Sequence, residues 1–467
     1  MRPNRRAVLM AGGALAAANA LPGTVASADP ADPWHQAQLI RWQVRPPSFP
    51  RRSYDITRFG AAGNGTTDCT EAFRQAIAEC HVNGGGRVLV PPGRYLTGPI
   101  HLRSNVNLHV SEGATVLFKT DPAAYLPVVL TRWEGTECYN YSPFVYALDQ
   151  HDIAITGRGT LDGQAPLGPW ESWYRSGGGQ SADQQALRRM GNEGVPVAAR
   201  VFGAGHFLRP NMIQLYRCRN VLISDVTILE PAMWTVHPVL CTNVTVRDIT
   251  VASTLFNTDG CDPECCANVL IAGCRFNTND DCVAVKAGRD EDGHRVGVPS
   301  QNILVEDCLL SGRWGGITVG SEMSGGVRNV FARRCVINSP DFPGNFPVKY
   351  PLYIKTNKLR GGFVENVHLR HFSGGGVERE AIFINMAYNN QAGTRPVVVR
   401  DISVEKMTID GARAVLNLVG LETDHMSHIR LSNSTFTNVR NPNTIQFVDD
   451  LVLHEVTING QPAEGAS

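Results

Sequence analysis

Short segments in which apolar and polar residues alternate recur along most of the chain at a nearly regular spacing. Many of them begin with Asn or Asp followed by aliphatic or β-branched residues, at Asn105, Asp152, Asn220, Asn243, Asn268, Asn302, Asn329, Asn366 and Asp401. From Asn220 to Asn329 the successive starts are 23 to 34 residues apart. This repeat predicts an all-β fold, a single-stranded right-handed parallel β-helix or solenoid. Each coil would bury its apolar face against neighbours about 4.8 Å away.

Two columns of residues support this register. Six positions after the leading Asn stand Val226, Ile249, Cys274, Cys308 and Cys335, and two positions before it stand Cys218, Cys241 and Cys266. Stacked thiols in a coil interior usually act as small hydrophobic residues. Neighbouring coils are close enough for a disulfide, so pairing stays an alternative for any two of them. We expect the Asn column to form a side-chain ladder that satisfies backbone groups of the turns.

The segment that precedes the coils predicts an N-terminal capping helix. Its apolar face consists of Ala72, Phe73, Ala76, Ile77 and Cys80. Thr67-Asp68 followed by Glu71 is typical of a capping box, and the helix should end at Gly84 to Gly86. A helix over the open end of the first coil would protect an exposed sheet edge.

The remaining domain boundaries follow from breaks in this pattern. Residues 163–210 interrupt the period with Gly, Pro and polar clusters, which indicates a long loop excursion that more often serves binding than folding. At the N-terminus, Arg5-Arg6 precede an Ala-rich apolar run and Ala26-Ser27-Ala28, which is typical of a twin-arginine export signal. We therefore expect a signal peptide over residues 1–28, an N-terminal extension over 29–50 and a β-helix domain over 51–467. The mature protein should be secreted.

Charge and cysteine content narrow the classes of function. The chain has 43 basic and 43 acidic residues, which excludes a general nucleic-acid binder. No later stretch has the length of a membrane span, so no membrane partner is expected. Twelve Cys in an exported chain would ordinarily suggest disulfides, but many fall on the core columns. We expect a monomer that needs neither a cofactor nor a metal.

Two acidic pairs lie close together between Asn257 and Lys286. Asp259 and Asp262 form the first pair, and Asp280 and Asp281 the second. Since nearly one coil separates Asp259 from Asp280, both should lie on the same face of adjacent coils, which would suit acid/base chemistry at a single bond. Crowded carboxylates raise the pKa of at least one member, because like charges disfavour ionisation. Alternatively, Asn-Asp-Asp and Thr-Asp-Gly form turns at strand ends. For Asp262 we favour a structural role.

A series of motifs in order along the mature chain resembles the polygalacturonase family of glycoside hydrolases (family 28). The resemblance is greatest to its bacterial, exo-acting-like branch within the pectin lyase-like β-helix superfamily. The motifs include Val90-Pro-Pro-Gly-Arg-Tyr-Leu-Thr-Gly-Pro, Gly159-Thr-Leu-Asp-Gly-Gln, Trp234-Thr-Val-His-Pro, Asn257-Thr-Asp, Asp280-Asp-Cys, Gly320-Ser-Glu-Met-Ser-Gly-Gly and Ile354-Lys-Thr-Asn.

This resemblance implies hydrolysis of pectic α-linked galacturonide with inversion. It implies that Asp280 is the general acid, that Asp259 and Asp281 activate the water, and that Lys355 contacts a substrate carboxylate or hydroxyl. An inverting pair should be roughly 6.5–9.5 Å apart to leave room for that water. Further substrate-binding candidates are Asn257, His237 and the guanidinium groups of Arg132 and Arg289. His237 could equally be a packed or hydrogen-bonded residue, and the two Arg could equally form surface ion pairs.

Two departures from the family pattern fall on residues around the predicted site. Trp314 or Gly315 stands where the family usually has His, and Tyr353 stands where it usually has Arg. Tyr supplies neither the permanent charge nor the planar fork of Arg, and Trp adds an apolar face that suits stacking. We therefore count Trp314 and Tyr353 as substrate-binding residues and expect specificity shifted from plain polygalacturonate. A neutral sugar, a modified uronide or a branched pectic chain would each fit.

Two other classes of function remain open. One is a polysaccharide lyase on the same fold, and the other is a non-catalytic pectic carbohydrate-binding relative. In either case, aromatic residues outside the coil pattern could stack on sugar rings or anchor the loops to the coils. These aromatic residues are Trp133, Tyr139, Tyr141, Trp170, Trp173 and Tyr174.

Overall fold

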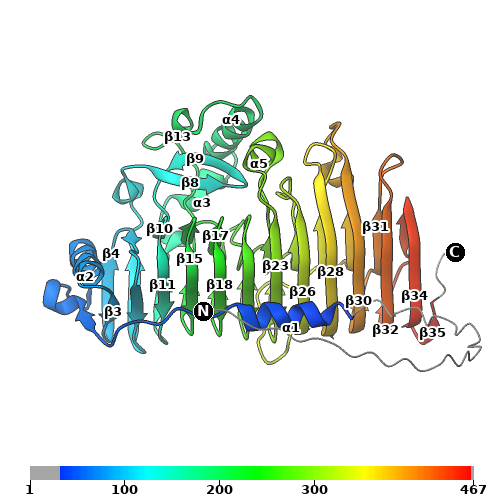
Figure 1. Cartoon of the computed structure of the whole chain (residues 1–467), viewed down its shortest axis with the longest axis horizontal. Helices are drawn as coiled ribbons and strands as arrows, with labels where there is room; N and C mark the ends of the chain where they lie inside the picture. Colours follow the sequence, from blue (N-terminus) through cyan, green and yellow to red (C-terminus); the bar gives the residue numbers. More distant parts are fainter. Residues whose placement is uncertain (1–31, 464–467) are drawn as a thin grey trace, which may run out of the picture.

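The computed structural model describes residues 32–463, and over this range the chain forms a parallel β-helix (Figure 1). The largest sheet has 22 strands. They are β1 (Ser53–Asp55), β2 (Asn64–Asp68), β3 (Gly86–Val90), β4 (Gly93–Thr97), β6 (Val106–Val110), β7 (Ala114–Phe118), β11 (His151–Thr156), β12 (Thr160–Asp162), β15 (Arg219–Ser224), β16 (Thr227–Leu229), β18 (Thr242–Arg247), β19 (Thr250–Ala252), β20 (Ala267–Ala272), β21 (Arg275–Thr278), β23 (Ser300–Glu306), β24 (Leu309–Gly312), β26 (Val327–Ile337), β28 (Gly362–Gly375), β30 (Val397–Ala412), β32 (Met426–Val439), β34 (Val448–Ile458) and β35 (Gln461–Pro462).

Two shorter sheets run along another side of the coils, and a small third sheet lies outside them. The four-stranded sheet contains β5 (Ile100–His101), β10 (Val145–Leu148), β14 (Ile213–Tyr216) and β17 (Val236–Val239). The six-stranded sheet contains β22 (Val283–Val285), β25 (Gly315–Val319), β27 (Tyr350–Lys355), β29 (Glu380–Asn385), β31 (Ala414–Val419) and β33 (Thr444–Gln446). The three-stranded sheet contains β8 (Val129–Trp133), β9 (Thr136–Asn140) and β13 (Val201–Phe202).

Helices are few and lie outside the coils. The α-helices are α1 (Trp34–Gln43), α2 (Thr70–Val82), α3 (Trp170–Tyr174), α4 (Gln180–Asn192) and α5 (Asp290–Val296). The 3-10 helices are η1 (Ile56–Phe59), η2 (Pro122–Tyr125), η3 (Ala165–Leu167), η4 (Val197–Ala199) and η5 (Tyr388–Asn390). In residues 32–463 no helix is long and apolar enough to cross a membrane.

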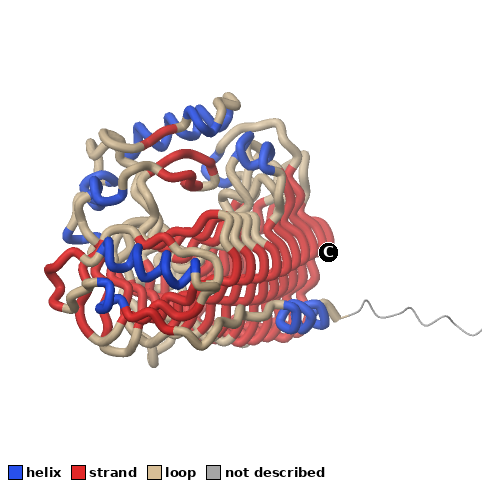
Figure 2. The backbone as a smooth tube through the Cα atoms, turned by 60° about the vertical axis from the view of Figure 1, so that its left-hand side comes forward, coloured by secondary structure: helices blue, strands red, loops and turns tan. Residues whose placement is uncertain are grey.

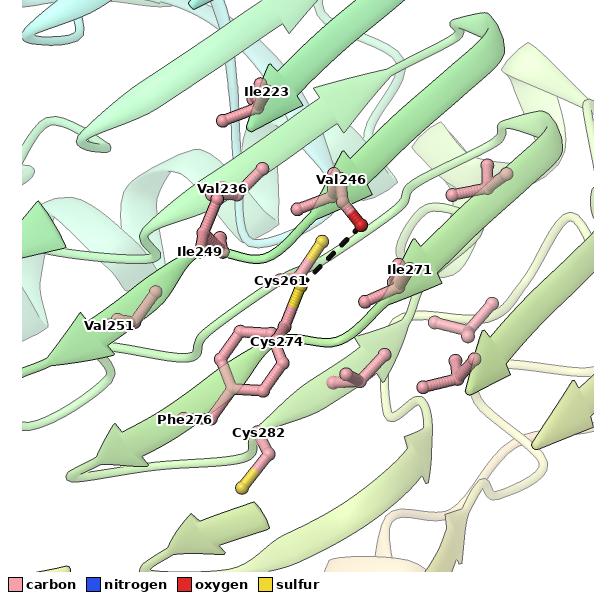
Figure 3. Close-up of a cluster of buried hydrophobic side chains, with 14 of the residues drawn as sticks. Ile223, Val236, Val246, Ile249, Val251, Cys261, Ile271, Cys274, Phe276 and Cys282 are labelled. Carbon is pink, nitrogen blue, oxygen red and sulfur yellow. Dashed lines mark hydrogen bonds between the residues drawn. The ribbon is translucent and has the colours of Figure 1, made fainter. Parts of the chain in front are cut away.

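The apolar positions of the repeat stack in register, as the sequence spacing predicted. Val221 pairs in parallel with Val244, Val244 with Val269, and Val269 with Ile303. All four side chains are buried, so each coil covers the apolar residues of the next. The Val226 to Cys335 column is buried as well, and Cys274 and Ile249 lie together in the interior (Figure 3).

The twelve cysteines, all within the described residues, are buried free thiols. Several of their sulfurs approach backbone carbonyls, as Cys274 Sγ does at 3.6 Å from the Val246 oxygen (Figure 3). The stacked thiols therefore act as small core residues, and the disulfide alternative is not realised in this structure.

The Asn column forms a ladder along one edge of the coils. Its residues have left-handed φ values of about 50–65°, a region that Asn tolerates better than most residues. The amide of Asn243 donates to Asn220 at 3.2 Å, that of Asn302 to Asn268 at 3.1 Å, and that of Asn329 to Asn302 at 3.0 Å. The predicted ladder is present, but these amides bond to one another rather than to the turn backbone.

Helix α2 lies at one end of the solenoid, beside β3 and β4 (Figure 1). Its five buried residues are the five apolar positions that the periodicity placed on one face. The prediction of a capping box at its start is wrong, however. Glu71 binds the side chains of Arg74 and Gln75, and it is Asp68 that accepts a hydrogen bond from the Thr70 N–H at 3.0 Å.

The excursions gather on one side of the coils. Helices α3 and α4, β13 and the β8–β9 hairpin form a wall there together with α5, whereas α1 lies on the opposite side (Figures 1 and 2). Helix α1, which the sequence pattern did not predict, packs Trp34, Ala37 and Ile40 against Leu304 and Phe331. The predicted signal peptide (residues 1–28) lies outside the described residues.

Candidate active site

The coil geometry brings the two acidic pairs together. Cys261 forms parallel bridges with Val236 of β17 and Val283 of β22, so the segment that holds Asp259 runs between these two strands. The Gly260 N–H donates to the carbonyl of Asp281 at 2.9 Å. As a result, one carboxylate oxygen from each of Asp259, Asp280 and Asp281 lies within 4.8 Å of the others. These oxygens are closer together than the roughly 6.5–9.5 Å expected for an inverting pair.

Asp281 is held in a position that favours its negative charge. Its Oδ1 accepts a hydrogen bond from the Gly315 N–H at 2.7 Å, and its Oδ2 accepts one from the Lys355 ammonium at 2.9 Å. The side chain is fully buried. A buried carboxylate needs such partners, because burial without them would strongly disfavour its charged form. Asp281 is therefore suited to act as a fixed anion and proton acceptor.

Asp280 is half-buried, whereas Asp259 and Asp281 are buried. Its Oδ1 accepts a hydrogen bond from the Asp281 N–H at 2.8 Å. Burial, followed by the negative charge of Asp281, raises the pKa of Asp280 to about 6. Asp280 can therefore carry a proton into the slightly acidic range and still reach the solvent-exposed part of the site.

Asp259 is joined by the fourth acid of the stretch, Asp262. Burial and the neighbouring carboxylates raise the pKa of both groups well above the usual range. The two oxygens of Asp262 are buried and have no hydrogen-bond partner among the described residues. Asp262 does not line the cavity, so its position fits the expected structural role. Because Asp259 and Asp262 repel each other when both are charged, the state with both acids ionised is disfavoured.

A network of buried ion pairs surrounds the three acids. The ammonium of Lys286 lies 3.6 Å from Asp259 and 3.3 Å from Glu322. Arg289 lies 3.0 Å from Glu322 and 3.1 Å from Glu134. Burial alone would raise the pKa of Glu322, but the charges of Lys286 and Arg289 outweigh it and hold that pKa well below the usual range. Glu322 is therefore the fixed anion that keeps these two cations in place.

The acids open into a cavity of about 390 Å³. It is lined by Glu134, Tyr174, Arg188, Trp234, Phe256, Asn257, Asp259, Asp280, Asp281, Lys286, Arg289, Trp314, Ser321, Glu322, Tyr353, Lys355, Tyr388 and Asn389. Residues of the wall (Tyr174 of α3, Arg188 of α4 and Glu134 of the β8–β9 turn) thus share the cavity with residues of the coils. This volume and mixed lining suit a sugar unit.

Aromatic rings alternate with the charges of the cavity. The Lys286 ammonium lies 4.5 Å from the centre of the Trp234 ring, and the Lys355 ammonium lies 4.4 Å from that of Tyr353. Tyr353 itself stacks on Tyr350 at 4.3 Å. These rings offer apolar faces of the kind that pack against the C–H faces of sugars.

Five of the seven substrate-binding candidates line the cavity: Lys355, Tyr353, Trp314, Arg289 and Asn257. His237 and Arg132 do not, and both are fully buried. His237 Nε2 lies 2.8 Å from Glu264, and Arg132 Nε lies 3.1 Å from the same carboxylate. The structure thus places these two away from the cavity, in buried pairs with Glu264, rather than in direct contact with a substrate. They support the site from behind, since His237 packs edge-on against Trp234.

The loop aromatics divide into anchors and one cavity residue. Trp133, Tyr141, Trp170 and Trp173 are buried, so they anchor the wall, whereas Tyr174 is 40% exposed and lines the cavity. Lys286, Glu322 and Glu134 line the cavity as well, and the sequence pattern did not indicate them as site residues. For Lys286 a signal existed, because it follows directly on the buried β22 in the acidic stretch. For Glu134, which is 155 positions from its partner Arg289, local pattern offered none.

The geometry suits acid/base catalysis more directly than metal binding. Three converging carboxylates could hold a cation, but Lys286 and Lys355 already supply positive charge beside them. Asp280 can carry a proton up to about pH 6, and it lies next to the carboxylate of Asp281, which an ammonium and an N–H hold in place. A proton donor beside a fixed carboxylate is what hydrolysis of a glycosidic bond requires.

Comparisons with known proteins agree with this chemistry. The model of glycosyl hydrolases family 28 matches residues 204–447, which include all three acids. The solved structure of a hyperthermoactive exopolygalacturonase from Thermotoga maritima is 45% identical, with a TM-score of 0.87 over 91% of this chain and 96% of that one. A probable polygalacturonase from Vitis vinifera is 29% identical over 82% of this chain and 74% of its own length. An exo-poly-alpha-D-galacturonosidase from Dickeya chrysanthemi is 24% identical over 87% and 70%.

Proposed function

Because the chain belongs to glycosyl hydrolase family 28 and is a glycoside hydrolase, we propose that it cleaves α-linked galacturonide or closely related pectic bonds with inversion. The observation that carries this proposal is the meeting of Asp259, Asp280 and Asp281 from adjacent coils in one cavity. A lyase would need a strong base and usually a metal or Arg at the carbanion, and an acid that carries a proton up to about pH 6 fits hydrolysis better.

Each acid has a separate role in this proposal. Asp280 gives its proton to the glycosidic oxygen as the bond breaks. Asp281, which accepts hydrogen bonds from Lys355 and the Gly315 N–H, takes a proton from the attacking water. Asp259, whose pKa is raised well above the usual range, shares in holding that water. Lys355 donates a hydrogen bond to Asp281 Oδ2 and lines the same cavity, where it can also contact a substrate hydroxyl or carboxylate.

We further propose that the sugar bound over these acids is not plain galacturonate. Each cation that lines the cavity already lies beside a carboxylate of the protein, so a substrate carboxylate there would have to compete for it. Tyr353 and Trp314 offer ring faces instead of positive charge. The wall residues Tyr174 and Glu134, which share the cavity with the coils, also favour attack at a chain end.

Product analysis over a set of pectic oligosaccharides would test the function. We expect the first product to carry the anomeric configuration opposite to that of the cleaved bond, read by NMR before mutarotation. Retention would contradict the inverting mechanism and would agree with the short spacing of the acids. Release of galacturonic acid from plain polygalacturonate at rates typical of the family would contradict the shifted specificity. An unsaturated product absorbing in the ultraviolet would indicate a lyase.

The pKa of Asp280 predicts the alkaline side of the pH profile. A general acid works only when protonated, and the raised pKa of about 6 keeps Asp280 protonated up to that pH. We therefore expect kcat/KM to fall about tenfold per pH unit above pH 6, because the protonated fraction falls by that factor. A profile measured from pH 4 to 8 with a neutral substrate checks this, and a fall that begins near pH 4 would contradict it.

Export and oligomeric state stay predictions. We propose that the chain is secreted after cleavage near Ala28, on the support of Arg5-Arg6 and Ala26-Ser27-Ala28. Sequencing the N-terminus of the exported protein would check the cleavage site. Light scattering of the purified protein would check the expected monomer.

A further inference from the structure

Arg313 differs from the cations inside the cavity, because it has no acidic partner. The cavity cations are all paired: Arg188 with Glu134, Lys286 with Glu322 and Asp259, Arg289 with Glu134 and Glu322, and Lys355 with Asp281. Within residues 32–463, no carboxylate lies within 4.0 Å of the Arg313 guanidinium. Arg313 is therefore a cation beside the site whose charge the protein leaves uncompensated.

The position of Arg313 is fixed by neutral groups. It lies between β24 and β25, is half-buried, and donates from Nη1 to the Asn279 side-chain oxygen at 2.8 Å. Its guanidinium lies 4.9 Å from the centre of the Phe256 ring and 5.6 Å from that of Phe346. Two rings and one amide orient the group and leave most of its five N–H donors without a protein acceptor.

The surroundings of Arg313 connect it to the cavity. Phe256 lines the cavity, and so does Trp314, which follows Arg313 in the chain. Phe256 also stacks on Tyr174 of the wall, with ring centres 5.4 Å apart. Arg313 thus stands beside the cavity, at a rim of aromatic faces formed by Phe256, Phe346 and Trp314.

We propose that Arg313 binds the carboxylate of a uronide, and that this uronide is the neighbour of the sugar bound in the cavity at the three acids. A planar guanidinium matches a carboxylate with two parallel hydrogen bonds, and the aromatic rim would pack against the sugar ring. The inference rests on the proposed function, because the proposed roles of the three acids set the position of the scissile bond. It assigns the recognition of negative charge to the rim, whereas the cavity itself binds the other sugar.

Binding of trigalacturonate and of its methyl ester to the Asp280→Asn variant would test this role, since that variant should bind without cleaving. In the otherwise native site we expect the ester to bind about tenfold more weakly, the loss of one charge-assisted contact. Adding Arg313→Gln should weaken the binding of trigalacturonate by about the same factor and abolish the difference in affinity between the two ligands. Arg313→Lys should recover part of the lost affinity for trigalacturonate. Arg158→Gln, at an exposed Arg paired with Glu112, is the matched control and should change nothing.

The outcomes separate this inference from the proposed function. If Arg313→Gln binds both ligands as its parent does, or if the parent binds the two ligands equally, then Arg313 is not a uronate site. In those cases the proposed function is still decided by the product analysis, which does not involve Arg313. Melting temperatures of the variants within about 1 °C of the parent would exclude misfolding as the cause.

Discussion

Asp280→Asn is expected to lower kcat by about a thousandfold or more, at the upper end of what loss of a general acid costs, while substrate binding is kept. Asn has nearly the same shape as Asp, and its side-chain oxygen can still accept the hydrogen bond from the Asp281 N–H. What it lacks is an acidic proton for the leaving oxygen. The effect should therefore appear in turnover and not in affinity.

The measurement is the initial rate of product release, with affinity determined separately by calorimetry. Asp341→Asn, at an exposed position, makes the same chemical change away from the cavity and should leave the rate unchanged. Unchanged turnover in Asp280→Asn would mean that another group is the acid. If the native protein binds the substrate but shows no turnover either, the result would instead favour the non-catalytic, carbohydrate-binding alternative.

Lys286→Met should be the most destabilising single change in the site, by about 3–5 kcal/mol in the free energy of unfolding. Lys286 is almost fully buried between Glu322 and Asp259, and its ammonium also donates to the carbonyl of Gly320 at 3.3 Å. Met keeps the length of the side chain and its packing on Trp234, but leaves Asp259 without its nearest cation and Glu322 with Arg289 as its remaining close cation. Breaking a buried pair costs more than never having formed it, because one charge stays buried alone.

Urea unfolding followed by circular dichroism gives this free energy. Lys349→Met is a close control, because Lys349 also lies 4.5 Å from the centre of a Trp ring, that of Trp314. Its acidic partner Glu378 is 50% exposed, so the change should cost under about 1 kcal/mol. Removing the second charge in Lys286→Met/Glu322→Gln should restore part of the lost stability. Equal effects of the two Lys substitutions would contradict the structural role of the buried network.

The fold could be predicted because a solenoid turns spacing along the chain into neighbours in space. Asn243, Asn268 and Asn302 start successive coils, and the same residues hydrogen-bond in a ladder. Register errors would have placed polar residues in the interior, so the alternation of apolar and polar positions leaves little freedom. For the same reason the separation of nearly one coil between Asp259 and Asp280 was enough to bring them together.

The excursions could not be predicted in this way. Helix α1 and the wall have no repeat, and their position depends on contacts over long sequence separations, such as Glu134 with Arg289. His237 illustrates the error that follows. Its motif suggested the cavity, but His237 is fully buried and its Nε2 lies 2.8 Å from Glu264. Similarly, the sequence suggested no clear role for Glu322, whereas the structure places the two cations Lys286 and Arg289 within 3.3 Å of it.

The sequence by itself determined the solenoid, the columns of its interior and the three acids that meet in the site, because these depend on contacts between neighbouring coils. Only the tertiary structure decided which charges around those acids are already neutralised and which are not. Ion pairing in a cavity depends on side chains from distant segments that meet within 4 Å, and on burial, which makes each pair strong. The acids could therefore be found in the sequence, whereas the pairing of the cavity cations and the unpaired state of Arg313 could not.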